Sequence, residues 1–140
     1  MATLSITASD VGLISGSSRK YTVASSETAG VDAGMFVTLD ATQQVVKLEN
    51  SLNNTAGLYG IYLCLNDAGP GQPVTVATSG ATVDLGLSSL DGNTYWANTS
   101  AGLVGLYSDV SVGEYLSMAG YGVASDYFYL SAYITQEQKV

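Results

Sequence analysis

Residues 71–80 read GQPVTVATSG, and residues 113–122 read GEYLSMAGYG. Each stretch begins and ends on glycine, and each carries apolar side chains at alternate positions in its middle. Alternation with a period of two is typical of a β-strand that buries one face. These stretches therefore predict two β-strands, and their likeness indicates that the chain contains one unit twice.

A second likeness lies upstream of each stretch. Residues 32–46 (DAGMFVTLDATQQVV) match residues 91–105 (DGNTYWANTSAGLVG) when the two are laid side by side, with aspartate against aspartate and an aromatic residue against an aromatic residue. Each predicts a short β-hairpin. Because hairpin, connection and glycine-led strand occur twice in the same order, we expect two related modules at about residues 29–86 and 88–132. The first of them carries an insertion.

The rest of the chain favours an all-β fold. Residues 58–65 (LYGIYLCL) predict a strand buried on both faces, and residues 66–73 (NDAGPGQP) carry the densest turn signal in the chain. No stretch shows the apolar spacing of an amphipathic helix. We expect residues 29–140 to form a single domain, a compact antiparallel β-barrel or β-sandwich. Residues 1–28, with short apolar clusters between serines, threonines and glycines, predict an extended N-terminal arm with one or two strands.

Composition excludes several classes of partner. The chain has 140 residues and a net charge of −8, with four basic residues in all: Arg19, Lys20, Lys47 and Lys139. Nucleic-acid binding requires a basic stripe that displaces counterions from phosphates, and these four residues do not form one. The same argument disfavours an anionic membrane surface. We expect neither nucleic acid nor a membrane as a partner.

The sequence carries no recognisable reactive site. Histidine is absent, which excludes imidazole bases, the usual triads and most metal sites. The twelve acidic residues lie mostly in predicted turns, where aspartate bonds its own backbone. The single cysteine, Cys64, lies in an apolar run and is interpreted as a buried, inert thiol. We therefore expect no catalytic, cofactor-binding or metal-binding residue, and a carboxylate-based hydrolase stays an alternative that requires two acids within reach.

The N-terminus has neither the basic region nor the continuous apolar stretch of a secretory signal, and no run is long enough to cross a bilayer. We expect a chain made in the cytoplasm.

Tyrosines crowd near the C-terminus. Their polar tips and large areas are typical of interfaces, although a core rim or a carbohydrate platform has the same pattern. The residues that we expect at an oligomer interface are Tyr121, Tyr127, Tyr129 and Tyr133.

Residues 29–80 resemble the small capsid cement (head decoration) proteins of tailed bacteriophages. The likeness runs from an AG turn through a V-x-LDA strand and a short VV strand to an ALNDA-like turn, and it ends in G-x-x-V-x-V-A-x-x-G. It covers a little over a third of the chain, and it departs from the family where Gln43-Gln44 replaces a glycine-bearing turn. The matching residues are Gly34, Val37, Leu39, Asp40, Ala41, Val45, Val46, Leu65, Asn66, Asp67, Ala68, Gly71, Val74, Val76, Ala77 and Gly80.

The resemblance implies a structural protein on the outer surface of the virion, commonly a homotrimer, that binds the major capsid protein and stabilises the icosahedral shell. In such proteins a terminal arm often contacts the shell. An alternative is a phage fibre or surface β-domain that binds host glycans through the tyrosine-rich strands. The residues that we expect to contact the capsid are Leu4, Ile6, Val11, Leu13, Ile14, Arg19 and Lys20.

Overall fold

The computed structural model describes residues 4–48, 60–88, 90–98 and 100–140. These residues form short strands and two single-turn 3-10 helices, as the frequent turn signals predict. The elements are η1 (Ala8–Asp10), β1 (Gly12–Ser15), β2 (Ser18–Thr22), β3 (Phe36–Leu39), β4 (Val45–Lys47), β5 (Tyr62–Cys64), β6 (Pro73–Ala77), β7 (Thr82–Asp84), β8 (Thr94–Ala97), β9 (Val104–Gly105), η2 (Tyr107–Asp109), β10 (Tyr115–Gly122) and β11 (Tyr127–Gln138).

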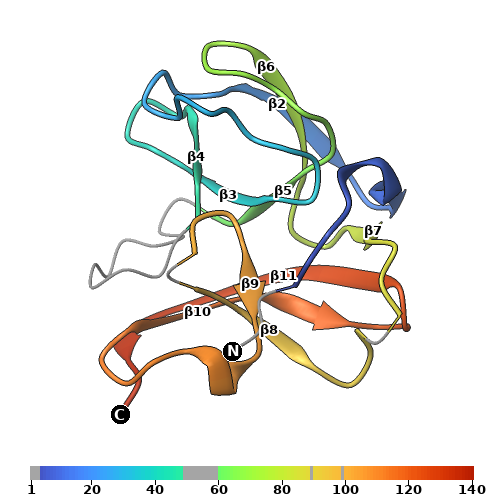
Figure 1. The fold of residues 1–140 in the computed structure, drawn as a ribbon, viewed down its shortest axis with the longest axis vertical. Coiled ribbons are helices and arrows are strands. Elements are labelled where there is room, and N and C mark those ends of the chain that lie inside the picture. Colours follow the sequence, from blue (N-terminus) through green and yellow to red (C-terminus); the bar gives the residue numbers. More distant parts are fainter. Residues whose placement is uncertain (1–3, 49–59, 89, 99) are drawn as a thin grey trace.

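The strands form two antiparallel sheets that pack against each other (Figure 1). The six-stranded sheet has the order β1-β7-β11-β10-β8-β9, and the five-stranded sheet has the order β2-β6-β5-β3-β4. Neither sheet closes into a barrel. The all-β prediction is confirmed, and of its two alternatives the structure is the sandwich.

The main core lies between the sheets. Phe36 and Leu63 of the five-stranded sheet and Tyr95, Phe128 and Leu130 of the six-stranded sheet belong to one buried cluster. The rings of Phe36 and Phe128 meet edge to face with centroids 5.3 Å apart. The sheets are therefore held together by large side chains whose burial stabilises the fold by roughly 1.5–3 kcal/mol each.

The five-stranded sheet has a second core on its other face. Val37, Val45, Cys64 and Val76 are buried there, and all four residues of β3 are buried. Val23, which follows β2, forms a parallel bridge with Val45 of β4 and closes part of the gap between the two edge strands. The apolar run that predicts a strand with two buried faces is β5, where Leu63 and Cys64 have no exposed surface. Residues 58 and 59 of that run lie outside the described residues.

Each sheet contains the same four-strand arrangement. In the five-stranded sheet the hairpin β3–β4 is followed by β5 beside β3 and then by β6. In the six-stranded sheet the hairpin β8–β9 is followed by β10 beside β8 and then by β11. The matched hairpins 32–46 and 91–105 thus hold corresponding positions.

The matched glycine-bounded stretches hold different positions. GQPVTVATSG forms β6 and GEYLSMAGYG forms β10. In the strand order, however, β10 of the six-stranded sheet corresponds to β5 of the five-stranded sheet, and β6 corresponds to β11. Their likeness reflects what any half-buried strand between glycine turns requires. The interpretation of these two stretches as equivalent strands is therefore wrong.

The predicted arm contributes strands to both sheets. β1 pairs with β7, and all five residues of β2 pair with β6. Residues 12–22 therefore contain edge strands of the sandwich, and Leu4, Ile6 and Val11 pack against its main core.

Candidate functional site: the open edge of β1 and β2

The two sheets have four edge strands, and two of them are covered by the chain itself. The edge of β9 is covered at Val104, whose carbonyl accepts a hydrogen bond from the Leu4 N–H at 2.8 Å. The edge of β4 is covered at Val45, whose carbonyl accepts from the Ala24 N–H at 2.9 Å. The Lys47 N–H of β4 donates to the carboxylate of Glu27 at 2.9 Å. Both edges are thus closed to another strand.

The edges of β1 and β2 are open. Within the described part of the chain, no strand or loop pairs with the outer side of β1 or of the first residues of β2, whereas the C-terminal end of β2 meets β4 through the bridge between Val23 and Val45. Because the two strands follow each other along residues 12–22, their open edges form one continuous surface, which we call the open edge. Unpaired backbone groups on an edge strand are a template for a strand from another molecule.

The backbone groups of β2 alternate between its two sides. The Val23 N–H donates to the Gln72 carbonyl at 2.9 Å, and the Ser17 carbonyl accepts from the Thr78 N–H at 3.1 Å. The odd-numbered residues of this strand therefore face β6, and Ser18 and Lys20 direct their N–H and C=O groups outward, away from the bridge between Val23 and Val45 at the end of the strand. Lys20 lies opposite Thr75, whose carbonyl accepts instead from the N–H of Leu65, the residue after β5.

The side chains of the open edge are exposed and of two kinds. Leu13 and Ile14 of β1 are 38% and 49% exposed, and Arg19 and Lys20 of β2 are also exposed. The open edge thus combines exposed apolar and exposed basic side chains on a protein whose net charge is −8.

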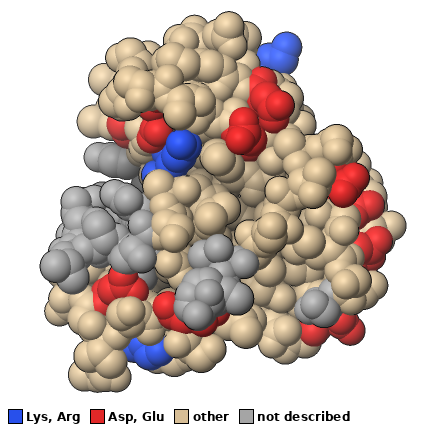
Figure 2. Space-filling view, viewed as in Figure 1, with Lys and Arg blue, Asp and Glu red and all other residues tan. Residues whose placement is uncertain are grey.

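Two of the four basic residues are engaged within the fold. Lys47 lies 4.0 Å from the Glu27 carboxylate, and the Lys139 ammonium donates to the carbonyls of Tyr107 and Val110. Arg19 and Lys20 lie within 4 Å of no carboxylate among the residues that the structure describes. Figure 2 shows acidic side chains over both halves of the molecule and few basic ones. The open edge thus holds two positive charges available to a partner.

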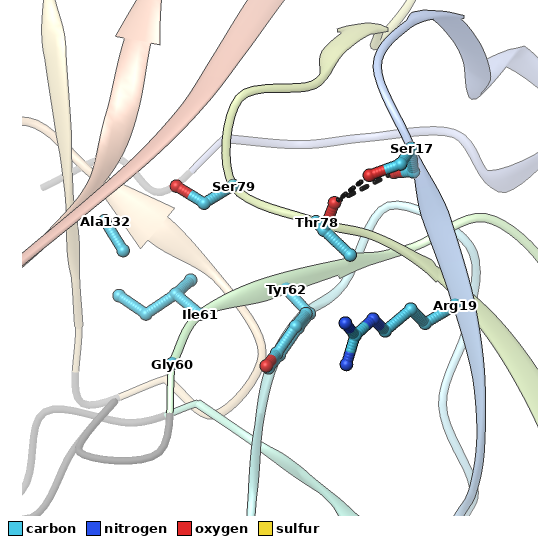
Figure 3. Close-up of a pocket in the computed structure, with 8 residues that line it drawn as sticks. All are labelled: Ser17, Arg19, Gly60, Ile61, Tyr62, Thr78, Ser79 and Ala132. Atoms are coloured by element: carbon cyan, nitrogen blue, oxygen red, sulfur yellow. Dashed lines mark hydrogen bonds between the residues drawn. The ribbon is translucent and has the colours of Figure 1, made fainter.

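A groove lies beside β2. One cavity of about 320 Å³ is lined by Arg19, Tyr62, Ser17 and Thr78 among others (Figure 3). A second, of about 300 Å³, is lined by Arg19, Tyr21, Tyr62, Leu39, Asp40, Ala41 and Gln43. The two cavities share Arg19 and Tyr62, so we treat them as one groove. Figure 3 shows the Arg19 guanidinium pointing toward Tyr62.

Side-chain interactions fix the wall of this groove. The rings of Tyr21 and Tyr62 meet edge to face with centroids 5.6 Å apart. Hydrogen bonding to Tyr21 raises the pKa of Arg19, and burial together with a hydrogen bond to Tyr21 raises the pKa of Tyr62. At neutral pH Arg19 is therefore charged and Tyr62 is a protonated hydroxyl, so both are hydrogen-bond donors.

The opposite wall is a tight turn. The Oδ1 atom of Asp40 accepts hydrogen bonds from the Thr42 N–H at 2.9 Å, the Thr42 hydroxyl at 2.7 Å and the Gln44 N–H at 3.0 Å. These bonds lower the pKa of Asp40, with the Thr42 hydroxyl as the largest cause. Gln43 adopts a positive φ of 61° in this turn, a conformation that usually falls to glycine.

The predicted contact residues divide into two groups. Leu13, Ile14, Arg19 and Lys20 are exposed on the open edge. The other three are partly buried against the protein's own core, and the side chains of Ile6 and Val11 lie over Gly34. Those three are Leu4, Ile6 and Val11.

All four predicted interface tyrosines lie on one surface, the outer face of the six-stranded sheet. Tyr121 pairs with Tyr129 across β10 and β11, and their rings lie 5.4 Å apart. Tyr127 is on the same face, opposite to the buried Phe128. Tyr133 is 61% exposed. We call this surface the tyrosine face.

The one cysteine of the sequence is buried in the fold. Burial raises the pKa of the Cys64 thiol to about 12, so the thiol is not nucleophilic at neutral pH. No group of three or more aspartate, glutamate or cysteine side chains in the described residues is placed to hold a metal ion. No described helix is long and apolar enough to cross a membrane.

No protein-family model matches the chain, and no curated protein matches its sequence. We therefore infer the function from the geometry of the open edge, the groove and the tyrosine face.

The groove was not predicted from the sequence. Alternation along β2 places Arg19 and Tyr21 on one face, which is a local signal. Tyr62 joins them only through the pairing of β5 with β6 and of β6 with β2, which no local pattern specifies.

Proposed function

We propose that this protein is a capsid cement protein, which binds the outer surface of an icosahedral shell and stabilises it by bridging subunits of the major capsid protein. The observation that carries the proposal is the position of residues 12–22. This one segment supplies both open sheet edges, the exposed Leu13 and Ile14, and the two cations without a carboxylate partner among the described residues.

The proposed mechanism is strand addition. An extended segment of a shell subunit pairs with the outward N–H and C=O groups of β2, so that main-chain hydrogen bonds supply affinity. Leu13 and Ile14 bury apolar area beside that contact. A second contact to a neighbouring shell subunit makes the protein a bridge, because separating the subunits then also breaks the cement contacts.

The tyrosine face is proposed as the contact between copies of the protein. Tyrosine supplies large area with a polar tip and is enriched at the centres of interfaces. Association into trimers multiplies weak shell contacts through effective concentration. Sedimentation velocity tests this part: we expect a trimer that dissociates in Tyr133→Ala. A wild-type protein that sediments as a monomer at high concentration contradicts it.

The capsid proposal is tested by co-sedimentation with expanded phage heads that lack decoration. Lys20→Pro removes an outward N–H without removing a hydrogen bond to β6, and Lys20→Ala is the matched control that removes the charge alone. We expect saturable binding of the wild type, weaker binding of Lys20→Ala, and a further loss of at least about tenfold in Lys20→Pro. Equal binding of the two variants rejects strand addition to β2, and no saturable binding of the wild type rejects the cement function.

A second candidate function is glycan binding by the tyrosine face. The observation in its favour is the placement of Trp96 on the same face, opposite Met118, with its ring against Tyr107 at 5.4 Å. Flat aromatic surfaces bind the apolar faces of sugars. A glycan array decides between the two: saturable hits lost in Trp96→Ala support this candidate, and an empty array rejects it.

A further inference from the structure

We propose that the groove beside β2 binds a carboxylate, presented by an acidic side chain of the extended segment that pairs with β2. This inference rests on the proposed function, because it names the chemistry of the segment that the open edge accepts. The groups that hold the carboxylate are Arg19, Tyr21 and Tyr62.

The second cavity of the groove lies between β2 and the β3–β4 turn, and we call it the wedge. Val23 and Val45, which follow its lining residues in the chain, are joined in a parallel bridge. Arg19 and Tyr21 line one wall of the wedge, Asp40 and Gln43 line the other, and Leu39 and Tyr62 complete the lining. A volume of about 300 Å³ accepts one side chain of a docked strand.

The donors of the groove match a carboxylate. A guanidinium is planar and presents two parallel N–H groups, which is the geometry of bidentate carboxylate binding. Arg19 is exposed and lies within 4 Å of no carboxylate in the described residues. The Tyr21 and Tyr62 hydroxyls lie beside it and interact with each other. Because one of the two O–H groups is used in this interaction, a partner carboxylate meets the charged guanidinium and one remaining hydroxyl donor.

The opposite wall restricts the charge of the ligand. Asp40 is held by Thr42 and Gln44, so its negative charge stays in place across the wedge. It repels an anion in proportion to that anion's charge. A singly charged carboxylate is therefore favoured over a phosphate dianion.

The strand register decides which of the two adjacent basic residues, Arg19 or Lys20, faces the groove. In a strand added to β2, alternate side chains project on the Arg19 side and the others on the Lys20 side. Arg19 lies opposite Val76, whose side chain belongs to the second core of the five-stranded sheet, and Lys20 projects from the other face beside Leu65 and Pro73. Arg19 and Lys20 are thus adjacent cations on opposite faces, and only Arg19 reaches the groove.

The test uses NMR titration of the full chain with two blocked five-residue peptides, acetyl-Thr-Val-Glu-Val-Thr-amide and its glutamine counterpart. The side-chain signals of Arg19 and Tyr62 report on the groove. We expect the glutamate peptide to shift these signals and to bind at least about fivefold more tightly than the glutamine peptide. Arg19→Gln removes this preference, and the matched control Lys20→Gln retains it. Asp40→Asn strengthens binding of the glutamate peptide, because it removes the repulsion.

Three results overturn the inference: equal binding of both peptides, equal losses in Arg19→Gln and Lys20→Gln, or weaker binding in Asp40→Asn while its turn signals are unchanged. The phage-head assay is scored separately. If the peptide preference is present and the heads are not bound, the groove stands and the cement function fails. If the heads are bound by Arg19→Gln as well as by the wild type, the carboxylate contact is overturned and the cement function stands.

Discussion

The ring of Phe36 meets the ring of Phe128 edge to face with centroids 5.3 Å apart, and this contact joins the two sheets at the centre of the core. Phe36 belongs to the β3–β4 hairpin and Phe128 to β11, and neither ring is exposed to solvent. Tyr95 lies on the other side of Phe128 with centroids 5.9 Å apart. The sandwich therefore depends on aromatic packing between strands far apart in the sequence.

Truncation of Phe128 tests this dependence. We expect Phe128→Ala to lower the free energy of unfolding by about 3–5 kcal/mol, because it removes a large buried ring and leaves a cavity. A cycle of Phe36→Leu, Phe128→Leu and the double variant is expected to give a coupling of about 0.5–1.5 kcal/mol. Urea unfolding measures both quantities, and a coupling of zero contradicts direct contact of the rings.

Cys64 predicts a loss of stability at high pH. Its pKa is raised from an ordinary 9.0 to about 12, first by burial and then by Asp32 and Asp67. Above pH 9 the unfolded chain releases the thiol proton while the folded chain keeps it until about pH 12, so the free energy of unfolding falls with rising pH across this window. The slope due to this group is at most about 1.4 kcal/mol per pH unit.

Comparison with Cys64→Ala isolates this contribution, because tyrosines and lysines titrate in the same range in both proteins. We expect the wild type to lose more stability than Cys64→Ala between pH 9 and pH 11. In the folded protein at pH 8, the thiol should react with a disulfide reagent only through opening of the fold. Parallel curves of stability against pH for the two proteins would show that folding does not raise the pKa of the thiol. Rapid labelling at pH 8 would show that the thiol is accessible in the folded protein.

The backbone conformation of Gln43 predicts that replacing this residue with glycine stabilises the protein. Its φ of 61° is unfavourable for a side chain with a Cβ, whereas glycine adopts it freely. We expect Gln43→Gly to raise the free energy of unfolding by about 0.5–1 kcal/mol. The neighbouring Gln44→Gly is the control and should lower it by a similar amount, because the described chain shows no positive φ there. A destabilised Gln43→Gly variant contradicts the described turn.

Gly34 anchors the predicted arm. Its φ is 91°, and a Cβ on it would lie 2.6 Å from the Cγ2 atom of Ile6. Gly92 has a φ of 82° and open space around it, so Gly92→Ala reports the backbone cost alone. We expect Gly34→Ala to destabilise the fold by about 1 kcal/mol more than Gly92→Ala and to shift the NMR signals of residues 4–11. Equal effects would show that Ile6 does not pack on Gly34.

The strands were predictable from the sequence, and their partners were not. Alternation identified β6 correctly, with Val74 and Val76 buried, because the pattern of a half-buried strand is local. The placement of β5 between β3 and β6 follows from pairing between distant segments, which alternation leaves open. The likeness of β6 and β10 therefore led to an incorrect correspondence.

The candidate site also depends on packing between distant segments, which local sequence patterns do not specify. Ile6 and Ile14 look alike in the sequence, as apolar residues among serines and glycines, yet one covers the core and the other is 49% exposed on β1. Only the fold separates a side chain that covers its own domain from one that faces outward. The shared face of Tyr127 and Tyr129 was predictable because the two residues alternate along β11, whereas Tyr121 and Tyr133 join them only through the pairing of β10 with β11.

We propose that this chain binds an icosahedral shell through the open edge of β1 and β2. Cryo-electron microscopy of expanded phage heads mixed with the protein tests this proposal most directly. We expect added density on the outer surface, with residues 12–22 against the shell and an extended shell segment paired with β2. Heads without added density, or density in which another face of the sandwich meets the shell and residues 12–22 face solvent, would contradict it.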